Sequence, residues 1–513
     1  MLVHIFAAKC IGINAVKVTV EVDITPGIGI HLCGLGDAAV KESLLRTVTA
    51  LQSLGYHIPG KKIVINLAPA HLHKTGSGYD LPIAIGIVAA SGQRNLPLIS
   101  DTLIMGELGL NGSIRAIKGG LPIADFAQGN GFKHCILPFE SAMEASSLDG
   151  IRVYGVNTLE EAIEILAGGE NADKYLVRGR ESAEDPVRIS SEVDFSDIIG
   201  QRAVKRAMEI AAAGGHNLIM IGSPGSGKSS LAKALAGILP PMSKEEAFMC
   251  SKIYSIAGIG NSSGGLMWRR PFRSPHYSAP LAALIGGGSG TENIIPGEVT
   301  LAHLGVLFLD EFNLMPKGVM EALRAPLEDG KVLISRLRSK VEYPADFTLV
   351  AAANPCPCGY YGEGDRCTCT PAERQRFLAR LSGPIMDRMD LQVLVRPISS
   401  SQLRSREQEE TSEQIARRVL ECRKRQQERF SGSGISANAS MTNRQISEYC
   451  PLDAESEDFM TSLMERMSLS MRAYYRIIRV ARTIADLQAC EQIKAEHLME
   501  AAGYRILDRS IID

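Results

Sequence analysis

The sequence has few of the features that mark an exported, membrane-bound or generally polyanion-binding protein. It has 513 residues, with one tryptophan, only 5% aromatic residues and a formal net charge of −2 at pH 7. A charge this close to zero gives no overall electrostatic footprint for nucleic acid, so any contact with a polyanion must be local. No uninterrupted apolar run reaches about 18–20 residues, which argues against a membrane span.

The first residues also lack a secretory signal. The stretch MLVHIFAAKCIGINAVKVTVEVD has no basic segment followed by a continuous apolar one, and it passes directly into the alternation of a strand. The cysteine count is odd, at 11. Without an export signal, this count fits a reducing compartment better than a disulfide framework. We therefore expect a cytoplasmic protein without a membrane partner.

Periodicity and composition divide the chain into three expected domains with an overall α/β character. Residues 1–168 alternate strand-like and helical runs, which predicts one α+β domain, and the polar residues 169–194 have the composition of a linker. In residues 195–396 helices alternate with short β-branched strands, which predicts a core built on a parallel sheet. From 397 to 513 the strands stop, and helical segments predict an all-α domain.

The most specific motif is GSPGSGKS, which follows the strand-like NLIMI and opens the helical SSLAKALAGIL. In this context it predicts a phosphate loop, whose backbone N–H groups hold phosphate oxygens at a helix N-terminus. Lys228 is expected to reach the β- and γ-phosphates of ATP, and Ser229 to bind magnesium. The expected nucleotide-binding residues are Gly222, Ser223, Pro224, Gly225, Ser226, Gly227, Lys228, Ser229 and Ser230.

Two further strand-like runs end in polar side chains. GVLFLDEF ends in Asp310 and Glu311, and FTLVAAANP ends in Asn354. Ligands of parallel sheets bind at the carboxyl ends of the strands, so we expect these side chains to join the phosphate loop. Asp310 would hold magnesium, Glu311 would polarise the attacking water, and Asn354 would hold that water or contact the γ-phosphate. Taken alone, an asparagine at a strand end is usually a turn former.

These segments resemble a known family. FSDIIGQ, the phosphate loop, LFLDE and AAANP together resemble the AAA+ ATPases, and RRPFRSPHYS, PGEVTLAHLGVLFLDEF and ARTIADL narrow the resemblance to magnesium-chelatase-like proteins of the YifB/ComM family. It runs nearly end to end. It implies a homohexameric ring with ATP at the subunit interfaces. It also implies a helicase on single-stranded or branched DNA that promotes branch migration of recombination intermediates in natural transformation, with a recombinase as a further partner.

The resemblance assigns roles to two arginines. Arg388, in SGPIMDRMDL, matches the arginine finger, whose guanidinium neutralises charge on the phosphoryl group of the neighbouring subunit. The alternative for Arg388 is a surface salt bridge. In SMRAYYRIIRVARTIADL, Arg472 is the best match for the second sensor and Arg476 the next. The other arginines of this segment, Arg479 and Arg482, are expected to solvate a helix face.

The segment KVLISRLRSKVEYPADF has two strand-like runs around a basic turn, and it resembles the hairpin that projects into the pore in this AAA+ branch. By this resemblance Arg336, Arg338 and Lys340 would contact DNA phosphates, which makes affinity steeply salt-dependent. A solvated hairpin is the alternative. The segment MWRRPFRSPHYS mixes cations with aromatic residues, and either binds single strands or relays the nucleotide state between subunits.

Four cysteines lie within NPCPCGYYGEGDRCTC, namely Cys356, Cys358, Cys367 and Cys369. Four thiolates can close a tetrahedral zinc site, although the single residue inside each pair departs from the commoner two-residue gap. Free thiols or a redox-labile pair are the alternatives. A zinc ion here would rigidify the loop that leaves Asn354.

In the N-terminal domain, HKTGSGYDLPIAIGIVAAS and MGELGLNGSIRAIKGGLPIADFA resemble the Lon protease domain. That peptidase needs a serine activated by a lysine, but Gly78 stands at the serine position and Pro122 replaces the lysine. Ser77 and Lys74 offer only a shifted pair. We therefore expect a scaffold that is not catalytic, and one that helps the ring to form or grips DNA.

Two functions rival the DNA motor. One is a chelatase-type remodeller of a protein partner, and the other is an ATP-dependent protease. The missing serine–lysine pair argues against the protease. The remodeller differs from the DNA motor only in the basic tip of the hairpin, so stimulation of ATP hydrolysis by DNA distinguishes the two.

Overall fold

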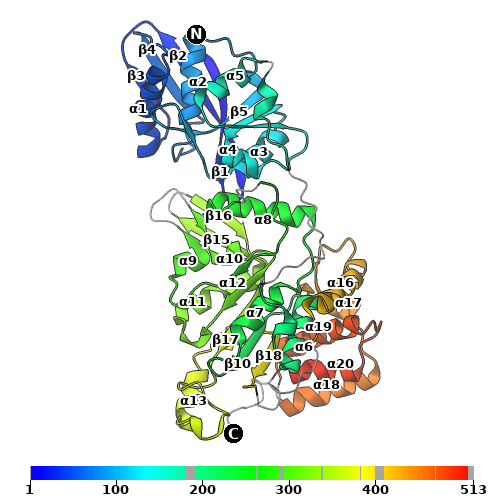
Figure 1. Cartoon of the computed structure of the whole chain (residues 1–513). Helices are drawn as coiled ribbons and strands as arrows, with labels where there is room; N and C mark the ends of the chain where they lie inside the picture. Colours follow the sequence, from blue (N-terminus) through cyan, green and yellow to red (C-terminus); the bar gives the residue numbers. More distant parts are fainter. Residues whose placement is uncertain are drawn as a thin grey trace.

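The computed structural model describes residues 2–169, 171–179, 192–260, 264–287, 294–336, 339–381, 383–398, 409–467 and 469–505. An N-terminal α/β unit is followed by a central unit on a parallel sheet and by a helical C-terminal unit (Figure 1). The expected fold class is therefore confirmed. Much of the expected linker, residues 180–191, lies outside the described residues, and the domain boundaries stay a prediction.

The N-terminal unit is a mixed sheet of seven strands in the order β3-β4-β2-β1-β5-β8-β9. Its strands are β1 (Val3–Ile11), β2 (Asn14–Thr25), β3 (Ile30–Cys33), β4 (Lys62–Ala68), β5 (Thr102–Ile104), β8 (His134–Pro138) and β9 (Arg152–Val156), beside a separate ribbon of β6 (Glu107–Leu108) and β7 (Ile114–Arg115). Its helices are α1 (Ala38–Ser53), α2 (Asp80–Ala90), α3 (Gly120–Gly129), α4 (Phe139–Glu144) and α5 (Leu159–Leu166). Helix α2 is apolar all round, and it is accordingly buried along almost its whole length.

The central unit is built on five parallel strands in the order β11-β14-β17-β10-β18. They are β10 (Leu218–Gly222), β11 (Phe272–Arg273), β14 (Val306–Leu309), β17 (Thr348–Ala353) and β18 (Leu391–Val395). Side chains alternate between the two faces, so Leu218 and Met220 join one hydrophobic core while Ile219 and Ile221 join another. Burial on both faces explains why the sequence shows continuous apolar runs rather than alternation.

Short helices and strands surround this sheet. The helices are α6 (Arg202–Gly214), α7 (Lys228–Ala236), α8 (Lys244–Ala257), α9 (Leu281–Ile285), α10 (Glu298–Leu301), α11 (Lys317–Ala322), α12 (Arg324–Asp329), α13 (Pro371–Leu378) and α14 (Gly383–Met386). Strands β12 (Gly286–Gly287) and β13 (Ile295–Pro296) form one small ribbon, and β15 (Lys331–Arg336) and β16 (Ser339–Pro344) form a hairpin. The hairpin is inserted between β14 and β17.

The C-terminal unit consists of helices that pack beside the sheet. They are α16 (Ser412–Arg429), α17 (Asn443–Tyr449), α18 (Ala454–Met467), α19 (Met471–Leu487) and α20 (Ala495–Gly503), and both α16 and α19 contact α6. Arg482 of α19 is only 2% exposed, and its Nε donates to Asp486 Oδ1 at 3.1 Å. The expectation that Arg482 solvates a helix face is therefore wrong, because the arginine closes a buried ion pair. In the described part of the chain, every helix is too short or too polar to cross a membrane.

The N-terminal unit is docked on α8 of the central unit (Figure 1). Lys252 Nζ of α8 lies 2.9 Å from Asp125 Oδ2 of α3, and the carbonyl oxygen of Ser255 accepts from the Gly119 amide at 3.0 Å. The turn between β1 and β2 also lies against the hairpin, since a methyl group on Gly12 would be 3.0 Å from Val341 Cγ1. Polar and packing contacts thus join the two units.

Candidate nucleotide-binding site

The register of the parallel sheet brings the three predicted motifs to one edge. Ile221 of β10 pairs with Ala353 of β17, and Leu309 of β14 pairs with Ala351. The phosphate loop, the two acidic residues and Asn354 therefore leave adjacent strands at the same end. Each strand is short and ends in a run of apolar residues and glycine, so the first polar side chain after it lies at this edge.

The phosphate loop has the backbone that its glycines permit. Gly225 and Gly227 adopt positive φ angles of 78° and 88°, a region that side chains rarely enter. A methyl group on Gly222 would lie 2.5 Å from the Val395 carbonyl oxygen of β18, so only glycine lets the two strands pair this closely. Gly227 then caps α7, whose free N–H groups open toward the loop.

Lys228 is folded back onto the loop. Its side chain is buried, and Nζ donates to the carbonyl oxygens of Gly222 and Ser223, both at 2.8 Å. Burial lowers its pKa, while the nearby charges of Asp310 and Glu311 oppose that shift. The two carboxylates therefore act on Lys228 across the sheet edge. Phosphate oxygens would have to replace the two carbonyl acceptors.

The residues that would hold magnesium are already in contact. Ser229 Oγ of α7 donates to Asp310 Oδ2 at 3.0 Å, and both side chains are accessible to solvent. A hydroxyl and a carboxylate are hard oxygen ligands of the kind that Mg²⁺ prefers. The hydroxyl of Ser226 is buried without a hydrogen-bond partner among the described residues, which suits a phosphate oxygen as its partner. The site thus fits ATP with magnesium.

Glu311 has an uncommon backbone. Its φ angle is +48°, in the left-handed region that non-glycine residues seldom occupy, and its N–H donates to Asp310 Oδ1 at 2.8 Å. Such conformations cluster at functional sites.

A further residue of the site, Asn313, was not predicted from the sequence. It is 1% exposed, and its Nδ2 donates to the Asn354 carbonyl oxygen at 3.3 Å. Its place three residues after Asp310 was the available signal.

The two arginines assigned by resemblance contact acidic residues other than Asp310 and Glu311. Arg388 is 8% exposed, its guanidinium donates to the Pro384 carbonyl oxygen at 2.7 Å, and it forms an ion pair with Glu328. Arg472 is well exposed and lies 3.8 Å from Asp387. Within one chain, then, Arg388 and Arg472 are held by acidic partners of their own.

Arg476, the second candidate for a sensor, takes part in a buried network instead. Its guanidinium lies 2.7 Å from Asp390 Oδ1, and the other oxygen of Asp390 lies 3.5 Å from His216 Nδ1. The Asn217 amide donates to the same carboxylate at 3.2 Å. Burial opposes ionisation of Asp390, but Arg476 and His216 more than offset it and hold its pKa below the usual range. This network joins α19 to the start of β10.

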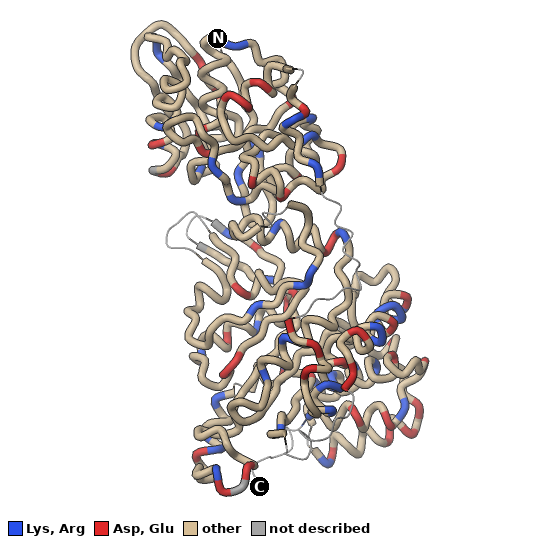
Figure 2. The backbone as a smooth tube through the Cα atoms, in the orientation of Figure 1, with Lys and Arg blue, Asp and Glu red and all other residues tan. Residues whose placement is uncertain are grey.

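The hairpin presents Lys340 as an exposed cation, and the backbone of Ser335 pairs with that of Lys340. Arg336 pairs with Ser339 across the end of the hairpin, whereas Arg338 lies outside the described residues. Elsewhere, cations and acids are interspersed along the described chain (Figure 2). This mixture agrees with a polyanion contact that is local rather than spread over one face.

The arginines of RRPFRSPHYS are engaged in structural contacts. Arg270 donates to the carbonyl oxygens of Pro240 and Leu304 at 2.6 and 2.8 Å, and Arg273 Nε lies 2.6 Å from Glu298 Oε2. Trp268 stays 42% exposed. These contacts fix the segment beside β14 and to α10, and both alternatives for its role stay predictions.

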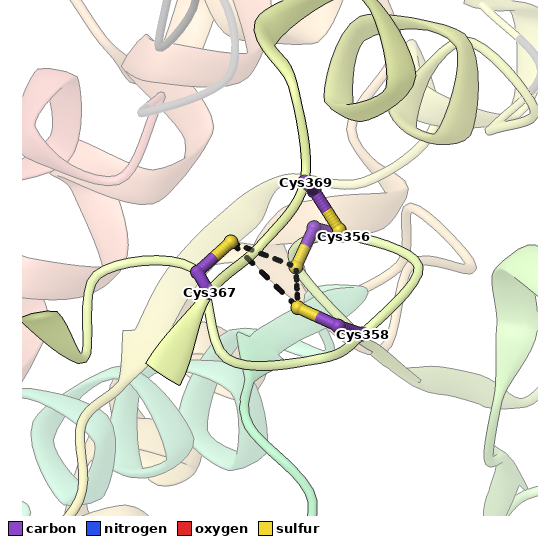
Figure 3. A group of neighbouring side chains, drawn as sticks. All are labelled: Cys356, Cys358, Cys367 and Cys369. Carbon is purple, nitrogen blue, oxygen red and sulfur yellow. Dashed lines mark hydrogen bonds between the residues drawn. The ribbon is translucent and has the colours of Figure 1, made fainter. Parts of the chain in front are cut away.

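The four cysteines meet in one place (Figure 3). All four Sγ atoms lie within 4.8 Å of one another, and no disulfide joins them. The Tyr360 amide and the neighbouring thiols lower the pKa of Cys358 to about 6, and burial together with hydrogen bonds from its neighbours raises the pKa of Cys356 to about 12. The surroundings of Cys358 thus favour its thiolate form.

The shifted serine–lysine pair of the N-terminal unit is engaged elsewhere. Lys74 is fully buried, and its Nζ donates to the carbonyl oxygen of Leu67 at 2.6 Å and to that of Pro69. The Ser77 hydroxyl bonds to the carboxylate of Glu107. These bonds occupy both groups that a peptidase dyad would require.

Comparison with known families places the chain in a class. A family model described as "Magnesium chelatase, subunit ChlI" matches residues 194–403, and its C-terminal counterpart matches 409–505. A third, "Subunit ChlI of Mg-chelatase", matches residues 20–141. The "Magnesium-chelatase 38 kDa subunit" of Cereibacter sphaeroides is 28% identical over 176 residues, covering 31% of this chain and 52% of that protein. The chain is an AAA+ ATPase of the magnesium-chelatase type, a class that uses ATP and magnesium.

Two full-length relatives narrow this class. "Uncharacterized protein YifB" of Salmonella typhimurium is 40% identical over 515 residues, which cover 100% of this chain and 98% of the relative. "Competence protein ComM" of Haemophilus influenzae is 40% identical over 510 residues, covering 98% of this chain and 97% of the relative. The chain belongs to the YifB/ComM family of magnesium-chelatase-like proteins.

Proposed function

We propose that this chain is an ATP-driven motor that forms a homohexameric ring and moves on single-stranded or branched DNA. One observation carries the proposal. The hairpin of β15 and β16 is inserted between β14 and β17, the two strands that end in Asp310, Glu311 and Asn354. The chain runs from Glu311 through α11 and α12 into the hairpin, and from the hairpin into the start of β17. We infer that a change at the nucleotide site reaches the hairpin through these segments, and the exposed Lys340 lies beside the turn.

The nucleotide site contains a residue for each step of ATP binding and hydrolysis. Lys228 would exchange its two carbonyl acceptors for phosphate oxygens, and Ser229 and Asp310 would hold magnesium, which neutralises charge on the phosphates. Glu311 would accept a proton from the attacking water, and Asn354 would orient that water. Ser226 would donate its unpaired hydroxyl to a phosphate oxygen.

In the proposed ring, Arg388 completes the site of the neighbouring subunit. The class commonly forms oligomers with nucleotide at the interfaces, and a guanidinium suits the developing phosphoryl charge. The ion pair with Glu328 has to open for this role, and Glu328 is well exposed, so water can take its place. Arg472 would act as the second sensor from the lid, with Arg476 as the other candidate.

Stimulation of ATP hydrolysis by DNA tests the motor. Hydrolysis by the full-length chain is measured without DNA and with single-stranded or forked DNA, at several salt concentrations. We expect DNA to raise the rate, and the effect to fall steeply with salt because phosphate contacts release counterions. Replacing Arg336, Arg338 and Lys340 together by alanine should remove most of this stimulation.

Lys331 offers a matched control on the same hairpin. It lies at the base of β15, with Nζ 3.2 Å from Glu342 Oε2, and it is half-exposed like many surface lysines. The Lys331→Ala variant should keep the stimulation by DNA. Equal hydrolysis with and without DNA would contradict the motor and favour a chelatase-type remodeller of a protein partner.

The cellular role follows from the relatives as a proposal. A relative is named a competence protein, so we infer that this motor works in the cytoplasm, beside a recombinase, on branched intermediates of natural transformation. Migration of a synthetic branched DNA by purified protein and ATP tests this role directly.

We also propose zinc as the ion of the cysteine cluster, because four thiolates are the set that structural zinc prefers.

A further inference from the structure

The cysteine cluster lies against the phosphate loop. Strands β17 and β10 are neighbours, so the loop that leaves Asn354 and the loop that leaves Gly222 begin at the same edge of the sheet. A methyl group on Gly359 would lie 2.7 Å from Cδ and 3.0 Å from Cγ of Pro224. The backbone just after Cys358 therefore packs directly on the phosphate loop.

The spacing of the sulfur atoms fits one tetrahedral ion. Cys356 Sγ lies 3.3 Å from Cys358 Sγ and 3.8 Å from Cys367 Sγ, and the latter two are 3.6 Å apart. With a Zn–S bond of about 2.3 Å, the edge of a regular tetrahedron is about 3.8 Å. A disulfide would need about 2.05 Å. Figure 3 shows Cys369 beside the other three, and its Sγ lies within 4.8 Å of each of them.

Gly359 belongs to the support of the cluster as well as to the contact with Pro224. The Gly359 amide donates to the carbonyl oxygen of Cys356 at 3.0 Å, so a hydrogen bond ties this glycine to a cysteine of the cluster. Hydrogen bonds around a metal site hold its ligands in place. The guanidinium of Arg366 lies 4.3 Å from the Tyr360 ring centroid and stiffens the connector. The cysteine loop thus fixes the position of Gly359.

We propose that one zinc ion held by the four cysteines is a positioning element of the nucleotide site. The zinc-closed loop fixes Gly359 against Pro224 and thereby holds the phosphate loop in the shape that binds ATP. This inference rests on zinc as the ion and on nucleotide binding at the phosphate loop. Its new element is that binding of zinc at the cysteine loop determines the affinity of the phosphate loop for nucleotide.

Two glycine variants isolate the contact. Gly359 and Gly362 lie in the same loop with φ angles of +86° and +91°, so alanine is strained at both, but a methyl group on Gly362 would meet nothing within 4 Å. Both variants should retain one zinc per chain. Gly359→Ala should weaken binding of a fluorescent ATP analogue about tenfold, and Gly362→Ala less than about twofold.

Metal removal provides the second measurement. Mass spectrometry of the purified full-length chain should find one zinc, and Cys367→Ser combined with Cys369→Ser should lose both the zinc and most of the nucleotide affinity. Cys490→Ser, outside the cluster, should change neither. Circular dichroism confirms that each variant is folded. Absence of zinc, or iron in its place, overturns the proposal, as do equal nucleotide affinities of the two glycine variants.

Lys228→Ala separates this failure from failure of the nucleotide site itself. If Lys228→Ala abolishes nucleotide binding while the two glycine variants bind alike, the site stands and only the coupling is refuted. If Lys228→Ala binds the analogue normally, the phosphate loop is not the nucleotide site, and both proposals fail together.

Discussion

At the scale of single residues, Arg388 gives the sharpest test of the ring. Among the described residues its one acidic partner is Glu328, so each of the two can be changed separately. If Arg388 serves a neighbour's phosphates, Arg388→Ala should lower ATP hydrolysis by about 10³-fold. Glu328→Ala only frees the arginine, and it should leave the rate within about twofold. Steady-state phosphate release measures both variants.

An ion pair that served only the fold would behave differently. Both variants would then lose a similar amount of stability, and neither would lose hydrolysis beyond that loss. Thermal unfolding of the two proteins, measured beside their rates, supplies this comparison. Mixing Arg388→Ala chains with Lys228→Ala chains adds a further readout, since a finger acting between subunits restores some sites in the mixture.

The residues that the sequence predicts for the nucleotide site lie together at one edge of the sheet, whereas the surroundings of the arginines could not be predicted. Lys228, Asp310 and Asn354 could be placed because each follows a short apolar strand, and parallel strands share one edge. The partners of Arg388 and Arg482 depend on helices and turns that pack together only in three dimensions. A charged side chain is usually exposed, so the burial of Arg482 against Asp486 carried no local signal.

At the scale of elements, the pair of Asp390 and Arg476 fastens α19 to the start of β18. Breaking a buried pair leaves one charge uncompensated, so Asp390→Asn should lower the free energy of unfolding by about 3 kcal/mol near pH 7. The folded pKa of Asp390 is depressed, so its contribution is complete above the unfolded value of about 3.9 and is lost as the pH falls below it.

Urea unfolding of the wild type and Asp390→Asn at pH 7 and pH 3 checks this prediction. The difference between the two proteins should be largest at pH 7 and should shrink at pH 3. Asp387→Asn is the matched control, because Asp387 is nearly half-exposed and lies 3.8 Å from Arg472. It should change stability by less than about 1 kcal/mol. A difference for Asp390→Asn that grows with acid would contradict the assignment.

The long periodic elements were predictable, whereas the short ones were not. Helix α16 is cation-rich yet keeps a buried stripe of Ile415, Val419 and Cys422, and its helical character was expected. Strand β11, with only Phe272 and Arg273, gave no pattern of its own and exists because β14 pairs with it. A two-residue strand is fixed by its neighbour rather than by its propensity.

At the scale of the whole molecule, the docking of the N-terminal unit on α8 predicts a local change in hydrogen exchange. Lys252 is nearly buried and bonds to Asp125, whereas the Gly119 and Leu121 amides of α3 bond to Ser255. Lys252→Ala should loosen this interface. Exchange of these two amides should then speed up about tenfold, which corresponds to about 1.4 kcal/mol of local stability.

Lys244 supplies the control at the same interface. It lies on α8 as well, 3.4 Å from Asp149, but both side chains are largely exposed. Exposed ion pairs contribute little, so Lys244→Ala should leave exchange in α3 unchanged. Equal effects of the two variants would show that α8 itself, rather than the Lys252 contact, had been disturbed.

The sequence indicated three units in order but not how they meet. Family resemblance and hydrophobic periodicity predict the structure inside one unit. The docking of two units depends on single pairs such as Lys252 with Asp125, which are far apart in the chain. Pairs of this kind are fixed by shape after each unit has folded. For the same reason, the contact of Gly359 with Pro224 could not be expected from either motif alone.

The contact of Gly12 with Val341 gives the hairpin a brace. Protein interiors resist compression, so a hairpin that moved toward the β1–β2 turn would press on the N-terminal unit. If the proposed motor moves the hairpin in that direction, we expect the N-terminal unit to tilt with it. A fluorescent dye on the N-terminal unit should then report each cycle of ATP hydrolysis.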